Sequence, residues 1–362
     1  MQTILILGAR APIALEMARS FSAFGCRVIM ADSLKWTLAR WSNSVEKYYR
    51  LSAPNTKLTK YILELKQIIS KEQVTHLIPT CEEAFYISMY KNEFACTVWT
   101  ANFNLMNQLH NKHDFIKLAS TYFSVPKTIS VDTFSDWANS KDYVFKPIYS
   151  RFATSVIINK NQEYCKRTIP QPDKWIAQER IHGKEICVYT VWNDGVLKAF
   201  AAYHPLMRIG KGSSIYFEPY FDEHLFEQIQ TFGTAINYTG QLCFDFIVNE
   251  NGAFVLECNP RGTSGAHLLH QKLAPAFLTN DSFILTSAKT FSIKAAILLT
   301  QPLSLFTKKF HRSSDVIIQY NDILPGLLQP LSLLEITYIK FKYNKTWLGA
   351  TTGDIEWDGH EN

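Results

Sequence analysis

The chain has 362 residues, which is too long for one average hydrophobic core and predicts two or three domains. A hydrophobic content of 47% with 19% charged residues is typical of a globular protein. The net charge is only +5, and the densest basic patch is the short stretch 308–312. We therefore expect no nucleic-acid partner.

The cysteines and the apolar runs bear on where the protein works. Seven cysteines, an odd number without C-x-x-C spacing, are typical of reduced thiols in a cytoplasm. No charged and then apolar leader opens the sequence. The uncharged run 295–307 is short for a membrane span, and Pro302 interrupts it. We expect a soluble cytoplasmic protein without a membrane partner.

The first hundred residues alternate between buried-strand and helical patterns. Strands are expected at 3–8, 26–31 and 76–79, and helices at 12–24 and 58–71. This alternation predicts a doubly wound parallel sheet. Ligands of such sheets bind at the carboxyl ends of the strands.

Those carboxyl ends are residues 8–10, Asp32 and 80–83. A dinucleotide site would need G-x-G-x-x-G, but Arg10 and Ile13 occupy the second and third glycine places. An NAD(P)-linked oxidoreductase is therefore only an alternative interpretation.

After about residue 110 the pattern changes to short paired strands, which predicts an antiparallel α+β region. We expect 143–146 to pair with 155–158, and 175–178 with 185–192. The strand 196–203 follows the turn Asn193-Asp194-Gly195. From about residue 296 the chain is apolar and helix-like, and it ends in a polar tail.

Two carboxylates lie within apolar strand patterns, Asp245 in 242–248 and Glu257 in 253–258. The turn signal at 249–252 predicts a β-hairpin. With a three-residue loop and Gly252 left-handed, Asn249 would face Ala253, and Asp245 would lie opposite Glu257. A two-residue loop would send the carboxylates to opposite faces.

Directly opposed carboxylates lie roughly 5 Å apart and repel one another unless a cation lies between them. Asn259 is two residues beyond Glu257 and points to the same face. Oxygen ligands without His or Cys suit Mg²⁺ or Mn²⁺. Arg261 adds a fork-shaped donor for phosphate. Two solvated carboxylates on a sheet edge are the alternative interpretation.

Several motifs occur together in one order: Lys112, Lys146-Pro147, the stretch 178–185 (QERIHGKE), Asp245, and 257–261 (ECNPR). Together they resemble the ATP-grasp superfamily, in particular its carbamoyl-phosphate-synthase and biotin-carboxylase-like branch. The resemblance covers about residues 1–270. It implies a pre-ATP-grasp α/β domain followed by a two-lobed ATP-grasp fold.

The resemblance also implies domain boundaries. The pre-ATP-grasp domain would be 1–110, the small lobe 111–180 and the large lobe 181–295, followed by a C-terminal apolar extension at 296–362. A homodimer interface, a brace or an acceptor-binding module would each fit that extension.

The resemblance implies a nucleotide site between the lobes. Lys112 and Lys146 would contact the ATP phosphates, and the backbone of Glu179 and Ile181 would read adenine. Glu185 would bind the ribose. Ser150 and Gln178 complete the expected ATP contacts. A surface lysine at 146, a helix-start lysine at 112 and a strand-edge carboxylate at 185 are the alternatives.

The implied metal ligands are Asp245, Glu257 and Asn259, and the implied reaction is carboxylate–amine ligation through an acyl-phosphate. Arg261, Arg208 and Lys146 would act in catalysis, although Arg208 also fits a free surface arginine. Substrate contacts are expected from Thr80, Glu82, Glu83, Arg151 and Ser264. Because adjacent acids on a strand diverge, one of Glu82 and Glu83 should be structural, for example as a helix cap.

The loop 148–155 is unusual for the family because it contains no glycine. Glycine lets backbone N–H groups approach phosphates closely. A stiffer loop, or one that binds the acceptor through Arg151, would follow. A non-catalytic nucleotide sensor is therefore a second alternative. His267 and His270 would either line the acceptor pocket or be ordinary core or surface histidines.

Overall fold

The computed structural model describes residues 1–150, 155–209, 212–285 and 289–359. Its N-terminal part is a five-stranded parallel sheet with the strand order β3-β2-β1-β4-β5, as predicted from the alternating pattern. The strands are β1 (Thr3–Leu7), β2 (Arg27–Asp32), β3 (Lys47–Arg50), β4 (His76–Ile78) and β5 (Thr97–Val98).

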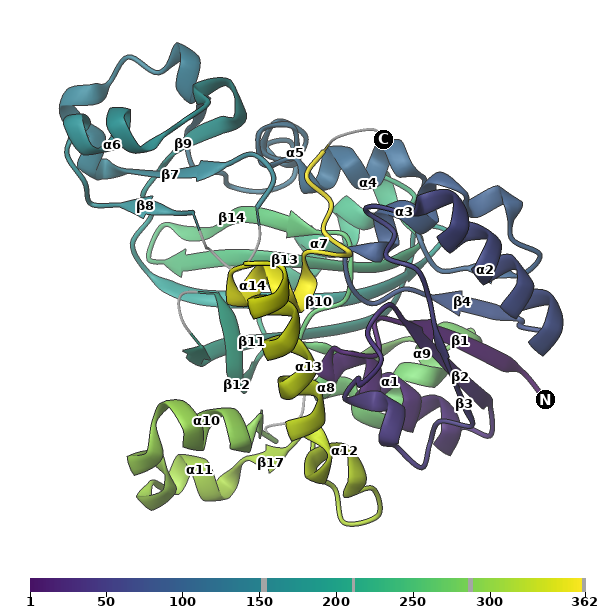
Figure 1. Cartoon of the computed structure of the whole chain (residues 1–362). Coiled ribbons are helices and arrows are strands. Elements are labelled where there is room, and N and C mark those ends of the chain that lie inside the picture. Colours follow the sequence, from purple (N-terminus) through teal and green to yellow (C-terminus); the bar gives the residue numbers. More distant parts are fainter. Residues whose placement is uncertain (151–154, 210–211, 286–288, 360–362) are drawn as a thin grey trace.

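Helices cover both faces of this sheet because its strands are apolar on both sides. The helices are α1 (Pro12–Ala23), α2 (Leu58–Glu72) and α3 (Glu83–Met89). Ile4 and Ile6 share a core with α1, whereas Leu5 and Leu7 share another with α2. The sheet is therefore doubly wound, with its carboxyl edge directed at the rest of the molecule (Figure 1).

Two short helices lead from this domain to the next sheet: α4 (Phe103–His110) and α5 (Lys112–Ala119). Asn111 separates them and caps α5, since its side chain accepts hydrogen bonds from the N–H groups of His113 and Asp114. The cap starts α5 at Lys112.

The small lobe is a four-stranded antiparallel sheet with the order β6-β9-β7-β8. Its elements are β6 (Thr128–Ser130), β7 (Tyr143–Pro147), β8 (Ile157–Ile158), β9 (Trp175–Glu179) and the helix α6 (Gln162–Thr168). The predicted pairing of 143–146 with 155–158 is present in β7 and β8.

The predicted pairing of 175–178 with 185–192 is wrong. β9 pairs with β6 and β7, and the strand after it belongs to another sheet. Residues 180–183 connect the two sheets, so neighbours in sequence are not neighbours in the ladder.

The large lobe is built on an eight-stranded sheet with the order β14-β13-β10-β11-β12-β16-β17, in which β15 pairs with β11. Its long strands are β10 (Lys184–Asn193), β11 (Val196–Ile209), β12 (Ser213–Tyr220), β13 (Gly240–Asn249) and β14 (Gly252–Asn259). The short ones are β15 (Phe283–Ile284), β16 (Phe291–Ser292) and β17 (Ser314–Asp315).

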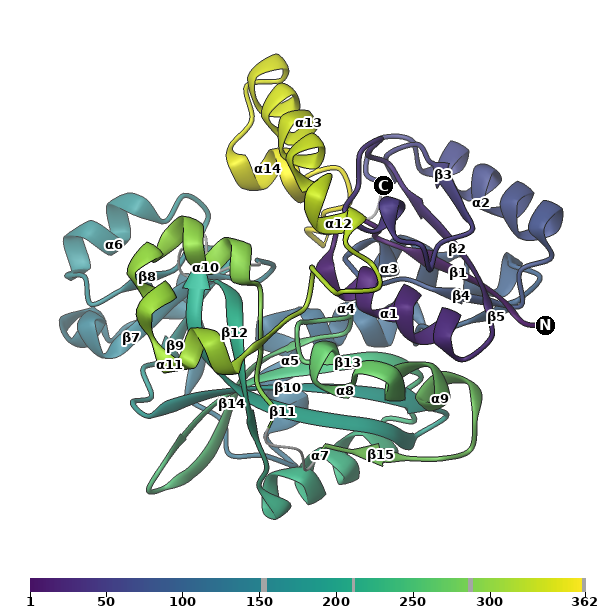
Figure 2. The same cartoon turned by 90° about the horizontal axis from the view of Figure 1, so that it is seen from below.

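The large sheet separates two cores. Tyr189, Ala201 and Cys243 on one face pack with α1 of the N-terminal domain. Val188, Phe200 and Phe244 on the other face pack with α5 and with α7 (Glu223–Ala235). The N-terminal domain and the large lobe thus share a core. Both views show α1 beside the large lobe (Figures 1 and 2).

Helices follow the hairpin, and those after about residue 296 lie in the stretch predicted to be helical. They are α8 (Ala266–Leu269), α9 (Leu273–Leu278), α10 (Lys294–Thr300), α11 (Lys308–Arg312), α12 (Leu324–Leu327), α13 (Gln329–Lys342) and α14 (Trp347–Thr352). α13 and α14 project beside the N-terminal domain (Figure 2), and the chain then returns toward α3 and α4 (Figure 1). Within the described ranges, no helix is both long and apolar enough to cross a membrane.

Candidate active site

The hairpin of β13 and β14 carries the predicted carboxylates, but its turn differs from the prediction. Asn249 pairs with Gly252, so the loop has two residues, Glu250 and Asn251, rather than three. The Asn249 side chain accepts a hydrogen bond from the Asn251 N–H at 2.9 Å, which fixes the turn locally. Gly252 has a φ of +120°, a conformation that favours glycine.

Asp245 nevertheless lies opposite Glu257. Val255 faces Phe246, and the next pair along the ladder is Asp245 with Glu257, so Leu256 is an extra residue on β14. This β-bulge compensates for the shorter loop. The Leu256 carbonyl lies 3.5 Å from Lys146 Nζ and 3.4 Å from Gln178 Nε2, so the bulge also contacts the small lobe.

Asn259 completes a polar row on the same face. Its side-chain amide donates to Asp245 Oδ2 at 3.4 Å, and its carbonyl oxygen accepts from Arg261 Nη2 at 3.4 Å. Among the residues that the structure describes, no group of three or more His, Cys, Asp or Glu is placed to hold a metal. The candidate donor set is therefore two carboxylates and one amide, a set of hard oxygen atoms that fits Mg²⁺.

Glu257 connects the two lobes electrostatically. Its Oε2 lies 3.7 Å from Lys112 Nζ and 3.7 Å from Lys146 Nζ. Burial alone would raise the pKa of Glu257, but the two ammonium groups hold it below its usual value. Burial, together with the neighbouring Glu257 charge, raises the pKa of Asp245. One carboxylate is thus firmly ionised while its partner holds its proton more tightly.

Neither lysine is a surface residue. Lys112 and Lys146 are 3% and 6% exposed, which is rare for lysine unless the ammonium is paired. Lys112 Nζ donates to the carbonyls of Ser150 at 3.0 Å and Ile148 at 3.4 Å. Burial lowers the pKa of Lys146, and the nearby Glu257 carboxylate opposes this effect.

The connection between the lobes contains the predicted adenine-reading residues. Gln178 is buried, and its Nε2 also donates to Thr128 Oγ1 at 3.1 Å. Glu179 and Ile181 border a cavity of about 530 Å³ between this connection and the hairpin turn. Gly183 lies against β13, where a Cβ atom would be 2.3 Å from the Val248 carbonyl oxygen. A side chain at position 183 would push the connection away from the large sheet.

Glu185 and Arg208 form an ion pair across β10 and β11. Glu185 is on the same face of β10 as Cys187, which lies opposite Asp245. The predicted ribose ligand and the predicted second arginine therefore lie together on the face that carries the metal-site residues. Arg208 also donates to the Gly212 carbonyl.

At the carboxyl edge of the N-terminal sheet, the two adjacent acids have different surroundings. Glu83 accepts hydrogen bonds from the N–H groups of Thr80 and Cys81, both at 2.9 Å, at the start of α3. Burial raises the pKa of Glu83. Glu82 Oε1 lies 3.8 Å from Arg261 Nε. The structural role expected of one acid is thus taken by Glu83, which holds the loop before α3 rather than capping the helix. Glu82 instead faces the arginine.

The remaining predicted substrate residues differ in how the structure places them. The Thr80 hydroxyl donates to the Leu7 carbonyl at 2.8 Å and so links β4 to β1. Ser264 lies between β14 and α8, and the Ser150 hydroxyl donates to the Pro147 carbonyl at 3.4 Å. Arg151 lies outside the described residues.

Comparison with known proteins identifies the central region. Residues 110–265 match the family model described as the ATP-grasp domain. The chain contains an ATP-grasp domain. No curated protein matches the chain in sequence.

Solved structures share the fold at low identity. N5-carboxyaminoimidazole synthetase from Staphylococcus aureus aligns with a TM-score of 0.64 at 12% identity, over 94% of this chain and 97% of that one. Biotin carboxylase from Campylobacter jejuni, in a β,γ-ATP complex, aligns with a TM-score of 0.60 at 14% identity. The alignment covers 75% of this chain and 70% of that one. L-amino acid ligase from Bacillus licheniformis aligns with a TM-score of 0.60 at 11% identity, over 78% of this chain and 75% of that one. The pre-ATP-grasp and two-lobed architecture is confirmed.

The two histidines after the ATP-grasp domain do not face the polar row. His267 Nδ1 and His270 Nδ1 lie 3.1 Å and 2.5 Å from the carboxylate oxygens of Glu16 on α1. Burial alone would raise the pKa of Glu16, but hydrogen bonds from both histidines lower it to about 2. These residues join the N-terminal domain to the large lobe. The only sequence signal for Glu16 is that it is an acid on the apolar face of a predicted helix.

A cluster of charged residues around Arg10 was also not predicted from the sequence. Arg10, at the predicted ligand edge, binds Asp32 and also Asp354 of the C-terminal segment. The positions of Arg10 and Asp32 after strands indicated a functional edge, but no pattern indicated that Asp354 would reach it.

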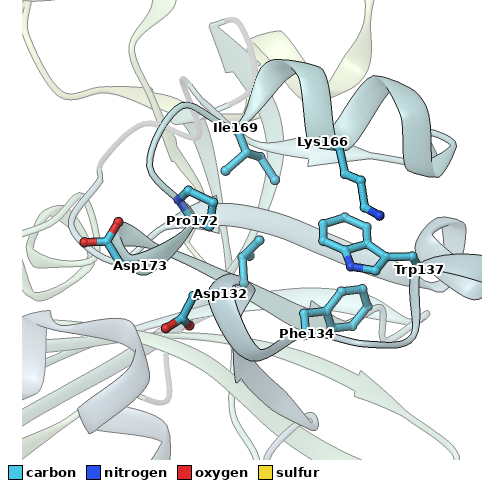
Figure 3. A pocket seen from close by; sticks show the side chains of 8 residues that line it. Asp132, Phe134, Trp137, Lys166, Ile169, Pro172 and Asp173 are labelled. Atoms are coloured by element: carbon cyan, nitrogen blue, oxygen red, sulfur yellow. The ribbon is translucent and has the colours of Figure 1, made fainter.

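A further hollow lies on the small lobe under α6 (Figure 3). It measures about 480 Å³ and is lined by Asp132, Phe134, Trp137, Lys166 and Asp173, among others. The Lys166 ammonium lies 4.9 Å from the centre of the Trp137 ring. None of the predicted site residues lines this hollow, so it is separate from the candidate active site.

Proposed function

We propose that this protein is an ADP-forming ligase that uses ATP and Mg²⁺ to join a carboxylate to an amine. The observation that carries the proposal is the position of Glu257, which lies opposite Asp245 and within 3.7 Å of two buried lysines. The ATP-grasp match supports it, as do the names of the structural neighbours, which include a synthetase and a ligase. One of the aligned synthetase structures is an ADP complex.

The proposed nucleotide contacts follow from position. Lys112 and Lys146 carry positive charge into a buried region, where they would neutralise the phosphates of ATP. Glu179 and Ile181 would read the adenine edge with backbone groups, and Glu185 would bind the ribose. Gln178 and Ser150 would support this site. Glu185 would exchange its present contact with Arg208 for the sugar, which would release Arg208 toward the phosphates.

The proposed metal ligands are Asp245, Glu257 and Asn259. When bound, Mg²⁺, or Mn²⁺ with the same preference for oxygen, would supply positive charge to the β- and γ-phosphates. Asp245 must lose its proton before it can act as a ligand, because the deprotonated carboxylate is the binding form. Glu257 is already ionised beside its two lysines.

The proposed reaction needs no covalent intermediate with a protein side chain. A carboxylate oxygen of the substrate attacks the γ-phosphorus, and ADP leaves with the electrons of the broken P–O bond. The amine nitrogen then attacks the acyl carbon, phosphate departs, and the amine proton leaves with it. Lys146 and Arg261 would stabilise the charge on the transferring group by position.

The acceptor would lie between Arg261 and the N-terminal domain. Arg261 suits a carboxylate or phosphate, and Glu82, 3.8 Å from it, suits an amine. Ser264 would extend this region. The hydrogen bonds of Thr80 and Glu83 within their own domain make these two residues supports for Glu82.

The decisive experiment is to incubate the protein with ATP, Mg²⁺ and pooled amino acids, and to measure ADP and new amide products by mass spectrometry. We expect ADP release that depends on the pool and yields a product with a new C–N bond. A matched control is Glu163→Gln on the exposed face of α6, which should keep full activity. Protein that binds ATP but releases no ADP with any pool would be a nucleotide sensor, and the ligase proposal would be wrong.

A further inference from the structure

The C-terminal segment 354–359 lies across the edge between the N-terminal domain and α4 (Figure 1). Arg10 holds its first residue through two hydrogen bonds to the Asp354 carboxylate, at 2.6 Å and 2.8 Å. The Tyr86 hydroxyl donates to the Glu356 carbonyl at 2.6 Å. Ile355 and Trp357 are 5% and 3% exposed. The segment is therefore packed as part of the body of the protein.

Trp357 anchors this segment beside α4. Its ring is in contact with Phe85, Tyr86 and Phe103, with ring centres 5.4 to 6.1 Å apart. Its indole Nε1–H donates to Asn107 Oδ1 at 3.2 Å, and its backbone N–H donates to Glu82 Oε2 at 3.1 Å. The indole thus makes one specific polar contact in an otherwise apolar setting.

Asn107 Oδ1 has a second donor, the hydroxyl of Tyr149, at 3.0 Å. The Tyr149 ring also lies against Gly359, where a Cβ atom would be 2.3 Å from the ring. Gly359 has a φ of +87°, which likewise favours glycine. The C-terminal segment therefore reaches Tyr149 twice, through the Asn107 hydrogen bond and through direct packing.

Tyr149 lies between the two residues whose carbonyls hold Lys112. The Lys112 ammonium donates to Ile148 and Ser150, and the Lys112 backbone N–H donates to the Ile148 carbonyl at 3.3 Å. Any shift of Tyr149 moves these two acceptors, because they are its immediate chain neighbours. The position of Tyr149 therefore determines where the Lys112 ammonium rests.

We propose that Trp357, Asn107 and Tyr149 are positioning residues that hold Lys112 in place beside Glu257. The chain of contacts runs from the C-terminal segment through Asn107 to Tyr149, then through two carbonyls to Lys112. Trp357 and Asn107 both lie outside the 110–265 range that matches the ATP-grasp domain. Two of the three positioning residues therefore come from parts of the chain that flank the domain, whereas Tyr149 belongs to the domain itself.

This inference rests on the proposed function only for what Lys112 does, and its structural claim can be tested without ATP. The absence of glycine from the loop 148–155 agrees with this positioning role, because a held tyrosine does not need a freely adaptable backbone.

The test measures how fast Lys112 reacts with an acylating reagent in the full-length protein without nucleotide, read by peptide mass spectrometry. Trp357→Phe removes the indole hydrogen bond to Asn107, and Tyr149→Phe removes the hydroxyl that donates to Asn107 and accepts from the Asn111 amide at 3.5 Å. Both variants keep an aromatic ring. We expect Lys112 labelling to rise about three- to tenfold, the equilibrium shift that one lost hydrogen bond produces. The exposed residues Trp347 and Tyr343 give matched controls as Trp347→Phe and Tyr343→Phe, which should leave Lys112 labelling unchanged.

A second measurement separates positioning from general stability. If the wild-type protein turns over ATP, Tyr149→Phe and Trp357→Phe should each raise the KM for ATP by a larger factor than they lower kcat. Variants that melt at a lower temperature but label Lys112 at the wild-type rate would overturn the inference. If the wild-type protein releases no ADP, the ligase proposal fails, while the labelling experiment still decides the role of Trp357 and Tyr149.

Discussion

Lys146 of the small lobe lies 3.7 Å from Glu257 of the large lobe, so a charge pair joins the two lobes at the proposed nucleotide site. Glu257 also faces Asp245, and both carboxylates would hold Mg²⁺ in the proposed function. The first prediction concerns this shared role.

Glu257→Gln should lower kcat/KM for ATP-dependent ADP release by about 100-fold, the typical effect of removing one electrostatic group from an active site. Without Mg²⁺, ATP should bind the variant at least as tightly as the wild type, because the two lysines lose a competing carboxylate. Calorimetric titration with and without Mg²⁺ measures both effects. An equal loss of ATP affinity in both conditions would contradict the assignment of Glu257 to the metal.

The second prediction is that the affinity for Mg²⁺ in the presence of ATP falls as pH falls. Burial and the Glu257 charge raise the pKa of Asp245. Its carboxyl therefore stays protonated up to a higher pH than that of an ordinary aspartate, and in that pH range Mg²⁺ must displace the proton in order to bind. Asp245→Asn should bind Mg²⁺ more weakly and lose this pH dependence. Titrations at several pH values on both proteins would check it, and identical slopes would contradict it.

The same raised pKa has a consequence for the free protein. Between its unfolded and folded pKa values, the folded state binds the Asp245 proton more strongly than the unfolded state does. The Asp245 contribution to stability therefore declines as pH rises through this window. Mg²⁺ with ATP should reverse the decline.

The third prediction concerns Glu16, which joins α1 to His267 and His270. Its folded pKa of about 2 lies below the ordinary value of 4.5, so its ionised form stabilises the fold above pH 4.5. This contribution, about 3 kcal/mol from the pKa difference, is lost as pH falls toward 2. Glu16→Gln should therefore unfold at lower denaturant concentration at neutral pH.

The difference between Glu16→Gln and wild type should shrink as the medium is acidified below pH 4.5. Glu163→Gln on the exposed face of α6 is the matched control and should unfold like the wild type. A Glu16 variant whose instability is the same at all pH values would indicate loss of packing rather than loss of the charge.

Much of the candidate site could be predicted because its residues are polar exceptions in apolar strands. Asp245, Glu257 and Asn259 stand out in this way, and they do share one face. The turn prediction was wrong because Asn249 and Gly252 suit either loop length. The bulge could not be found from the pattern, since Val255 and Leu256 are both apolar and no alternation marks the extra residue.

Long-range contacts explain the rest of what the sequence could not predict. Arg10 and Asp354 are 344 positions apart, and neither occurs in a motif that names its partner. The pairing of β9 was also wrong, because a strand that ends at an interlobe connection resembles the first half of a hairpin. Hydrophobic periodicity and turn residues predict where helices and strands occur. Contacts between residues far apart in the sequence depend instead on how the folded domains pack together.

The last prediction tests Glu82, which lies 3.8 Å from Arg261 at the end of the site nearest the N-terminal domain. Glu82→Gln keeps an oxygen that can accept the Trp357 N–H, so the C-terminal segment should stay in place. It removes the negative charge that we assign to the amine substrate. The KM for the amine should rise about tenfold, as loss of one charge-assisted hydrogen bond implies, while the KM for ATP should stay constant.

Steady-state kinetics with each substrate varied in turn measures this difference. Glu93→Gln, an exposed acid in the short helical turn that follows α3, is the matched control and should change neither constant. If Glu82→Gln raised the KM for ATP and left that for the amine unchanged, Glu82 would act on the nucleotide side through Arg261. The amine would then have to be recognised elsewhere, because Glu83 is held by the backbone N–H groups of Thr80 and Cys81.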